Sequence, residues 1–541
     1  MLSYRKLAMR VLGRPLHTGR IDSPRPASQR AAAFILTAAM LTTLTAPAFA
    51  KEWYIEEGDI TVRAGETEGT NKVSQGENPE VEDTNTVITN SDKDKASSNT
   101  VTIEAKDKDD KVEVTLKDVN IDASSRSEAA VSVTGSGNTT IKLDGDNALK
   151  SDIYSSGISS SGSLTISGGE NDSLTAQGGS GADGIYSSGS LTISGGTVTA
   201  NGGSSGGDGG DGIWSSGGVT ISGGSTVTAN GGDGKDDYGG DGIRSDSGDV
   251  TISGGSTVTA NGGNGGNVSG DGIRSDSGDV TISGGTVKAA GGDSKDGYGG
   301  DGIRSGGVTI SGGTVNAAGG NGGKVGGYGI CSFARVAISG GTVNAAGGNG
   351  KNSNGGSDGI ISNDIDLSGS LELTAKAGRP NGKAISWAGH ELDLDTIKDK
   401  LGPGAKVTAT DANGETKQVS IPRPVEPEES SSSSDGGSAA PSAPASPLPG
   451  LTVTDKDGQR ISYTSTQSGN TLTVCVGRFT ASFRISLAAL RQLRAEGIET
   501  ITFQTILCST TLSVDELLAM GGEDAEAVLT HRLTDSSLTV G

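Results

Sequence analysis

Hydrophobic and polar positions alternate along the middle of this chain in short segments that recur at a nearly constant interval. A Gly-Ile pair opens each unit, a segment of the Leu/Val-Thr-Ile type follows, and Thr-Val-Thr-Ala or a close variant ends the alternation. Alternation with a period of two over three or four residues predicts short strands with one buried face. The eight pairs begin at Gly157, Gly184, Gly212, Gly242, Gly272, Gly302, Gly329 and Gly359, spaced by 27, 28, 30, 30, 30, 27 and 30 residues.

The repetition predicts a stack of coils. Three short strands joined by glycine-rich corners make one coil of a parallel β-solenoid, and successive coils lie about 4.8 Å apart. Ile, Val, Leu and Ala are expected to fill a thin interior, while Thr and Ser face water. No coil can bury its apolar face alone, so the stacking of neighbours provides the core. The predicted fold class is therefore all-β, a parallel β-helix with about three short strands per coil.

The composition supports this interpretation only because the pattern is periodic. The chain of 541 residues contains 91 glycines and 3% aromatic residues, values that without periodicity would indicate a disordered chain. The stretch between the third segment and the next Gly-Ile pair varies most in sequence. Insertions confined to one edge are where a solenoid usually places its binding surface.

The regions that flank the repeats differ in character. The first 50 residues combine seven Lys/Arg with the apolar run AAAFILTAAMLTTLTA and an Ala48-Phe49-Ala50 cleavage pattern. They predict a signal peptide and a secreted or cell-surface protein; an uncleaved membrane anchor is the alternative, although the run is short for a membrane span. Near the other end, Glu391 to Leu401 could form a short capping helix, and Ser486 and Ser513 are expected to cap helices of a small domain.

Changes in composition divide the chain into six parts. A Pro/Ser-rich segment predicts an extended linker, and the strand and helix signals after it predict a small α+β domain. The predicted parts are the signal peptide 1–50, an N-terminal cap with irregular first coils 51–128, the repeat solenoid 129–383, a C-terminal cap 384–420, the linker 421–450 and the α+β domain 451–541.

The charge and the cysteines exclude several kinds of protein. The net charge is −22, and removal of the basic leader leaves −28, which should repel nucleic acid. No second long apolar segment follows the leader, so no transmembrane segment is expected after cleavage. Three cysteines are too few for a disulfide framework; Cys475 and Cys508 could pair after export or remain separate thiols, and Cys331 is left over.

Three stretches of the chain resemble a known family. They are LKDVNIDASS at 116–125, AAVSVTGSGNTTIKLDGDNALKS at 129–151, and the recurring GI, SSG and LTISGG units. Together they resemble a clostridial family of secreted, carbohydrate-binding, right-handed β-helix proteins that are distantly related to pectate lyases. The resemblance covers about Asp59 to Ala384 and implies a right-handed helix that binds plant-type or acidic polysaccharide, with calcium as a candidate ligand. The longer Gly-Asn-Asp loops and the uniform coils of this sequence depart from the family and leave the particular ligand open.

The residue after each Gly-Ile pair is the first candidate for ligand binding. If the Ile side chain points inward, its neighbour points outward, so these residues should form one strip along the solenoid. Aromatic faces stack on the C–H surfaces of sugars, and arginine binds carboxylates bidentately. The alternative is a solvated ladder whose arginines pair with nearby Asp. The candidate residues are Tyr186, Trp214, Arg244, Arg274 and Arg304.

A second column consists of the aspartates that precede the Gly-Ile pairs. Like charges one coil apart repel each other unless they are solvated, paired or bridged by a cation, and calcium takes such oxygen ligands readily. Turn-forming Asp residues that pair with the arginines are the alternative. The column comprises Asp183, Asp211, Asp241, Asp271, Asp301 and Asp358, of which Asp211, Asp241, Asp271 and Asp301 are the candidate calcium ligands.

The sequence gives little support for catalysis. The histidines after the leader are His390 and His531, both outside the coils, and no nucleophile or metal-ligand motif is apparent. A lyase on this fold would use calcium-bound Asp and an Arg base, but here both recur in coil after coil. We therefore expect a carbohydrate-binding protein without catalytic activity, with polysaccharide or cell-surface components as partners. The alternatives are a surface adhesin or stalk without sugar affinity, and a calcium-dependent polysaccharide lyase.

Overall fold

The computed structural model describes two compact units, each considered by itself. It covers residues 51–422 except 354, and residues 450–540 except 456–458, 462, 469, 477, 479, 496, 506–508, 521–524 and 532–535. The first unit ends at Glu426 and the second begins at Pro427. The predicted signal peptide and most of the predicted linker lie outside the described residues. Within the described residues, none of the helices has the length and apolar character that a membrane crossing requires.

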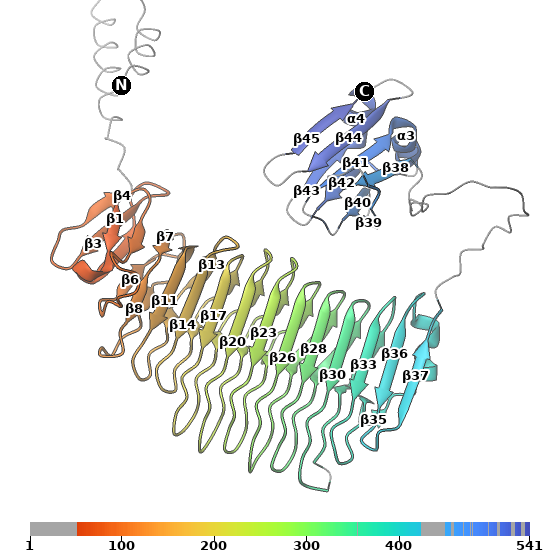
Figure 1. Cartoon of the computed structure of the whole chain (residues 1–541), viewed down its shortest axis with the longest axis horizontal. Coiled ribbons are helices and arrows are strands. Elements are labelled where there is room, and N and C mark those ends of the chain that lie inside the picture. Colours follow the sequence, from red (N-terminus) through yellow and green to blue (C-terminus); the bar gives the residue numbers. More distant parts are fainter. Residues whose placement is uncertain are drawn as a thin grey trace, which may run out of the picture. The chain divides into compact units, whose positions relative to one another are not determined.

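The first unit is a parallel β-helix of about 14 turns, which confirms the predicted fold class. Most repeat coils contribute three strands: two join one sheet, and the third joins a 12-stranded sheet. In the coils that begin at Gly302 and Gly329 the first two strands are continuous, as β27 and β29. Figure 1 shows the second sheet as a row of strands from β8 to β37. In the first sheet, the repeat strands are β12 (Ile158–Ser160), β13 (Ser163–Ser167), β15 (Ile185–Ser187), β16 (Leu191–Ile193), β18 (Ile213–Ser215), β19 (Val219–Ile221), β21 (Ile243–Ser245), β22 (Val250–Ile252), β24 (Ile273–Ser275), β25 (Val280–Ile282), β27 (Ile303–Ile310), β29 (Ile330–Ile338), β31 (Ile360–Ser362) and β32 (Asp364–Leu367). The second sheet contains β8 (Asn120–Asp122), β11 (Asp146–Lys150), β14 (Ser173–Gln177), β17 (Thr197–Asn201), β20 (Thr226–Asn230), β23 (Thr257–Asn261), β26 (Thr286–Ala290), β28 (Thr314–Ala318), β30 (Thr342–Ala346), β33 (Glu372–Lys376), β36 (Lys406–Thr410) and β37 (Thr416–Ser420).

The interior is built from aliphatic ladders, as the sequence pattern predicts. The Ile of each Gly-Ile pair stacks on the same residue of the next coil, for example Ile213 on Ile243, and both side chains are fully buried. Val227 and Ala229 of β20 stack in the same way on Val258 and Ala260 of β23. Because each coil contributes only small and medium aliphatic residues, the core is thin and continuous along the helix.

One part of the predicted pattern is wrong, because a column of serines lies inside. Ser187, Ser215, Ser245 and Ser275 are buried, although serine was expected to face water. Each hydroxyl donates a hydrogen bond to a glycine carbonyl at the corner of the preceding coil, as from Ser215 to Gly189 over 2.8 Å and from Ser275 to Gly248 over 3.0 Å. The hydroxyl therefore binds a corner carbonyl outside the strands, and some of these carbonyls, such as that of Gly189, also accept a hydrogen bond from a backbone N–H of the next coil.

The glycine-rich stretches form ordered double-stranded loops. Their two limbs exchange backbone hydrogen bonds in a zigzag that passes from coil to coil: Gly240 N–H donates to Gly232 O, Gly263 N–H to Gly240 O, and Gly270 N–H to Gly263 O. The limbs lie so close that a Cβ atom on Gly270 would be 1.8 Å from the carbonyl oxygen of Gly240. Glycine is therefore required here by packing rather than by backbone dihedral angles.

Antiparallel pairing and a short helix close the ends of the solenoid. At the N-terminal end β2 and β3 form a hairpin, and at the C-terminal end β36 pairs with β37. The helix predicted near Glu391 to Leu401 is present as η2 (Leu394–Lys400), and the Asp393 side chain accepts a hydrogen bond from the Asp395 N–H. The remaining elements are β1 (Glu52–Tyr54), η1 (Ile55–Glu57), β2 (Ile60–Ala64), β3 (Asn71–Gln75), β4 (Val81–Asp83), β5 (Val87–Thr89), β6 (Val101–Glu104), β7 (Lys111–Lys117), β9 (Val131–Thr134), β10 (Asn138–Asp144), β34 (Ile385–Trp387) and β35 (His390–Glu391).

The second unit is a small α+β domain with its own core. Two four-stranded sheets are described, and Phe483 and Phe503 pack against each other with ring centroids 4.9 Å apart. Ser486 and Ser513 accept hydrogen bonds from the N–H groups of Ala489 and Glu516, as expected for helix caps. Cys475 is a free thiol, and Cys508 lies outside the described residues. The elements are β38 (Leu451–Thr454), β39 (Thr464–Ser468), β40 (Thr471–Cys475), β41 (Ala481–Ser486), α3 (Leu487–Ala495), β42 (Thr500–Gln504), β43 (Ser509–Ser513), α4 (Val514–Met520), β44 (Glu526–His531) and β45 (Ser536–Val540).

Candidate functional site

The five candidate binding residues lie in one column on the outside of the first sheet, here called the outer column. Strand register pairs each with the next: Tyr186 with Trp214, then Arg244, Arg274 and Arg304. Each follows a fully buried isoleucine and is itself half-buried. The alternation of the strands therefore gives the column one side chain per coil, at intervals of about 4.8 Å.

Aromatic contacts order the first half of the outer column. The rings of Tyr186 and Trp214 meet edge to face with centroids 5.2 Å apart, and the Arg244 guanidinium carbon lies 5.1 Å from the Trp214 ring centroid. The indole N–H of Trp214 is buried and has no acceptor among the described residues. Trp214 thus brings its ring rather than its N–H to the surface.

Aspartates form hydrogen-bonded ion pairs with two of the three arginines of the outer column. Arg244 binds Asp246 through Nε over 3.0 Å and Asp276 through Nη2 over 3.1 Å. Arg274 binds Asp276 through Nε over 2.6 Å. The pairing of arginine with nearby aspartate, the alternative interpretation of these residues, is therefore present for Arg244 and Arg274.

The aspartates before the Gly-Ile pairs form a buried ladder. The Oδ1 atom of each accepts a hydrogen bond from the backbone N–H of the equivalent residue in the next coil, as from Asp241 to Asp211 over 2.5 Å and from Asp301 to Asp271 over 2.6 Å. Burial, together with repulsion from the next aspartate, raises the pKa of Asp241 and of Asp271 to about 7. Burial also raises the pKa of Asp183 and of Asp301 to about 6, and that of Asp211 well above its usual range.

This ladder does not fit a calcium ion. Calcium needs six to eight converging oxygens, whereas Asp211, Asp241, Asp271 and Asp301 are stacked one per coil, each with one carboxylate oxygen occupied by a backbone N–H. Across the described ranges, no three His, Cys, Asp or Glu side chains are grouped so that they could hold a metal ion. The contacts of these four residues assign them a structural role instead.

The corner next to the outer column and the contacts of its arginine differ at Arg304 from those of the preceding coils. The corner after Arg304 is Gly306-Gly307, two residues shorter than the corner after Arg274, and the register shifts between β27 and β29 at this corner. Phe333 of β29 is 53% exposed, and the Arg304 guanidinium carbon lies 5.3 Å from its ring centroid. Beside Phe333 is a hollow of about 240 Å³, lined by Tyr328, Cys331, Ser332, Phe333, Ile361, Ser362, Asn363 and Gly389.

Sequence reasoning missed Phe333 and Trp387, which are exposed aromatic residues two coils apart, on either side of the coil that carries Asn363. Trp387 is 49% exposed and donates a hydrogen bond from Nε1 to the Asn363 carbonyl oxygen over 2.9 Å. The unit spacing of 27 instead of 30 before Gly329 was the signal that this coil is irregular, because its corner residues no longer align with those of the earlier coils.

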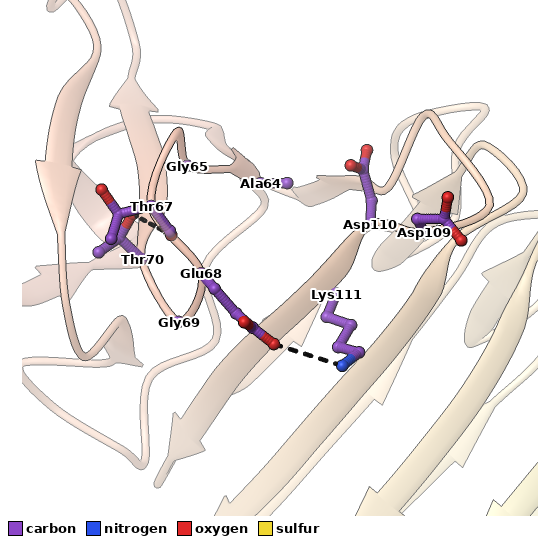
Figure 2. A pocket seen from close by; sticks show the side chains of 9 residues that line it. All are labelled: Ala64, Gly65, Thr67, Glu68, Gly69, Thr70, Asp109, Asp110 and Lys111. Atoms are coloured by element: carbon purple, nitrogen blue, oxygen red, sulfur yellow. Dashed lines mark hydrogen bonds and ion pairs between the residues drawn. The ribbon is translucent and has the colours of Figure 1, made fainter.

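Two other hollows are polar. In the N-terminal cap, a hollow of about 230 Å³ lies between the turn at 65–70 and the loop at 107–110, where Glu68 and Lys111 approach to 3.5 Å (Figure 2). A groove of about 810 Å³ follows the loop edge of the solenoid, with Asp233, Lys235, Asp293 and Lys295 among its lining residues. Neither lining includes an aromatic ring, so neither matches the outer column as a candidate.

Similarity to known proteins is confined to the coils. A family model described as a beta helix repeat matches residues 191–213, 219–243, 280–303 and 308–330. These coils are beta helix repeats. Three of the matched segments end at Ile213, Ile243 and Ile303, one residue before Trp214, Arg244 and Arg304, so the match identifies the repeat and includes no residue of the outer column. No curated protein and no solved structure matches the chain.

Proposed function

We propose that this β-helix acts outside the cell as a carbohydrate-binding protein, and that it holds an extended polysaccharide along the outer column without cleaving it. The observation that carries the proposal is the outer column itself: aromatic rings and guanidinium groups, one per coil, along one straight face. A repeating polymer and a repeating surface can form the same kind of contact several times over.

The residue types of the outer column suit sugars. Tyr186 and Trp214 present ring surface that can stack on sugar C–H faces, and Arg304 presents a fork that can bind hydroxyl or carboxylate oxygens. Because the strands hold all five residues in fixed register, little conformational entropy is lost when a ligand binds. The leader pattern at 31–50 and the family resemblance of the coils support the same proposal.

A glycan array at fixed salt, followed by titration calorimetry of the best ligand, tests this proposal. We expect Trp214→Ala to weaken binding about tenfold, since one stacked aromatic ring contributes on the order of 1–2 kcal/mol. Tyr238→Ala is the matched control, because Tyr238 is 50% exposed but lies on a loop away from the outer column.

Three results would contradict the proposal. Absence of binding to every glycan would favour a stalk or adhesin. Equal affinity of the two variants would exclude the outer column as the binding face. If polygalacturonate released unsaturated products, measured by their ultraviolet absorbance, the protein would be a lyase instead of a binding protein.

A further inference from the structure

We infer that the coil carrying Arg304 holds a distinct subsite for a carboxylated sugar, formed by Arg304, Phe333 and the hollow beside Phe333. The inference rests on the proposed function, because it assigns one unit of the bound polysaccharide to one place on the outer column. The sugar unit bound there is a uronate, a sugar that carries a carboxylate.

The number of aspartates that hold each arginine through a hydrogen bond falls along the outer column. Arg244 bonds to two, Asp246 and Asp276, and Arg274 bonds only to Asp276. For Arg304, the only carboxylate within 4.0 Å in the described part of the chain is that of Asp301, at 4.0 Å, and its side chain is 41% exposed against 30% for Arg244. Arg304 therefore retains a guanidinium fork that no corner aspartate occupies.

The sequence of the corner explains this difference. Arg244 and Arg274 are each followed two residues later by an aspartate, and residues two apart on a strand lie on the same face. Gly306 takes this position after Arg304, so its coil supplies no carboxylate. In the coil after Arg304, the register shift places Phe333 beside the Arg304 guanidinium. The corresponding neighbour of Arg244, in the coil after it, is Asp276.

The surroundings of Arg304 suit a sugar acid better than a simple anion. The exposed Phe333 ring offers a face for sugar C–H groups, and the adjoining hollow of about 240 Å³ can admit one sugar ring beside Tyr328 and Ile361. Cys331 lies directly next to Arg304 in strand register, so the hollow continues the outer column. A uronate whose carboxylate binds Arg304 bidentately and whose sugar ring lies over Phe333 uses both the free guanidinium fork and the exposed aromatic ring.

The matched test compares two arginines of the same column with two forms of the same ligand. Oligogalacturonate and its methyl-esterified form differ in the carboxylate, which the ester replaces with a neutral group that is one methyl larger. At about 0.15 M salt, where charges more than about 8 Å apart are largely screened, we expect Arg304→Gln to weaken binding of the acid form at least tenfold and of the ester less than threefold. Arg274→Gln should weaken binding of the acid and of the ester by a similar factor, because Asp276 already holds the Arg274 guanidinium and leaves it less able to distinguish the two forms.

A second pair of variants acts without removing the arginine. Gly306→Asp should supply the missing corner carboxylate and weaken binding of the acid form by about as much as Arg304→Gln does. Gly306→Asn, which has nearly the same size but no charge, should bind like the unaltered protein. The Cβ position of Gly306 lies 3.1 Å from the Gly278 carbonyl oxygen and 3.3 Å from Asp279 Oδ1, so both side chains require a small adjustment, and the new Asp carboxylate also adds a charge near Asp279. Melting curves of all variants check that the fold is retained.

The outcomes separate this inference from the proposed function. If both ligands bind and Arg304→Gln behaves like Arg274→Gln, the subsite is refuted while polysaccharide binding stands. The same holds if Gly306→Asp and Gly306→Asn are indistinguishable. If a neutral glycan from the array binds but oligogalacturonate does not, the uronate subsite is refuted alone. If no glycan binds at all, both fail together.

Discussion

At the scale of single residues, one small polar side chain helps this backbone to turn the corner of each coil. The carbonyl groups of this corner lie outside the strands. The buried serine next to the outer column satisfies one of them, and Ser275 also accepts a hydrogen bond from the Gly278 N–H over 3.0 Å. A corner therefore depends on one hydroxyl that both donates and accepts.

We expect Ser275→Ala to lower the free energy of unfolding by about 1–3 kcal/mol, because it leaves the buried Gly278 N–H without its acceptor and removes one of the two hydroxyls that donate to Gly248 O. Ser277→Ala, an exposed position on the same corner, is the control and should change stability by less than about 0.5 kcal/mol. Urea unfolding followed by circular dichroism measures both. Equal effects would show that the buried hydrogen bonds do not contribute to stability.

At the scale of the element, the glycine-rich loops form a layer in which the backbone limbs pack directly against each other. Their limbs are held together mainly by backbone hydrogen bonds, with some from buried serines, as from the Gly265 N–H to Ser269 Oγ over 3.0 Å. Their outer edge carries a second ladder in which Asp233 Oδ1 accepts from the Asn264 N–H and Asn264 Oδ1 from the Asp293 N–H. Alternation of Asp with Asn separates the charges along this ladder. The buried Asp ladder has no such alternation; burial is the main cause of its raised pKa values, and repulsion between neighbours adds to it at Asp211, Asp241 and Asp271.

Gly270→Ala should disrupt the loop layer, because its Cβ would lie 1.8 Å from a backbone oxygen of the preceding coil. We expect a loss of about 1–3 kcal/mol and faster hydrogen exchange at Gly262–Gly270 than in the unaltered protein. In Gly206→Ala the new methyl group has no neighbour within 4 Å, so exchange should be unchanged. If hydrogen exchange in Gly270→Ala were the same as in the unaltered protein, the close packing of the two limbs would not contribute to the stability of the loops.

The aligned units predicted the coil, the three strands and the outer column, because alternation and spacing are direct consequences of stacking. Two features escaped prediction. The serine column was expected outside, since nothing in the sequence shows that a corner carbonyl needs a buried donor. Phe333 was missed because a one-residue change in register decides which side chain meets Arg304, and the shorter unit spacing before Gly329 indicates an irregularity without showing that change.

At the scale of the whole molecule, the buried aspartates make stability depend on pH. Their pKa values are raised on folding, so the folded state binds more protons than the unfolded chain between about pH 4 and 7. The stability they contribute is fully present below about pH 4 and is lost as the pH rises through about 6 to 7. Ion pairs that lower the pKa of Asp59 and of Glu104 act oppositely at lower pH, which places the optimum in between.

We therefore expect the solenoid to unfold at a lower temperature at pH 8 than at pH 5. Asp271→Asn keeps an oxygen that can accept the Asp301 N–H but removes one titrating group, so it should stabilise the protein at pH 8 by about 1 kcal/mol and flatten the dependence. Asp249→Asn is the control: Asp249 accepts the same kind of hydrogen bond, from the Asp279 N–H, but is exposed. Thermal melts from pH 4 to 9 compare them, and parallel curves for the two variants would contradict this account.

The hydrogen-bonding pattern of one coil is nearly the same as that of the next, and this has a consequence for how the protein can change in evolution. A duplication or loss of one whole unit, such as the 30 residues from Gly242 to Asp271, would leave every ladder continuous and both capped ends intact. Unequal recombination between near-identical stretches of the gene produces such changes readily. Copy number, rather than substitution, would then set how long a polymer the surface can hold.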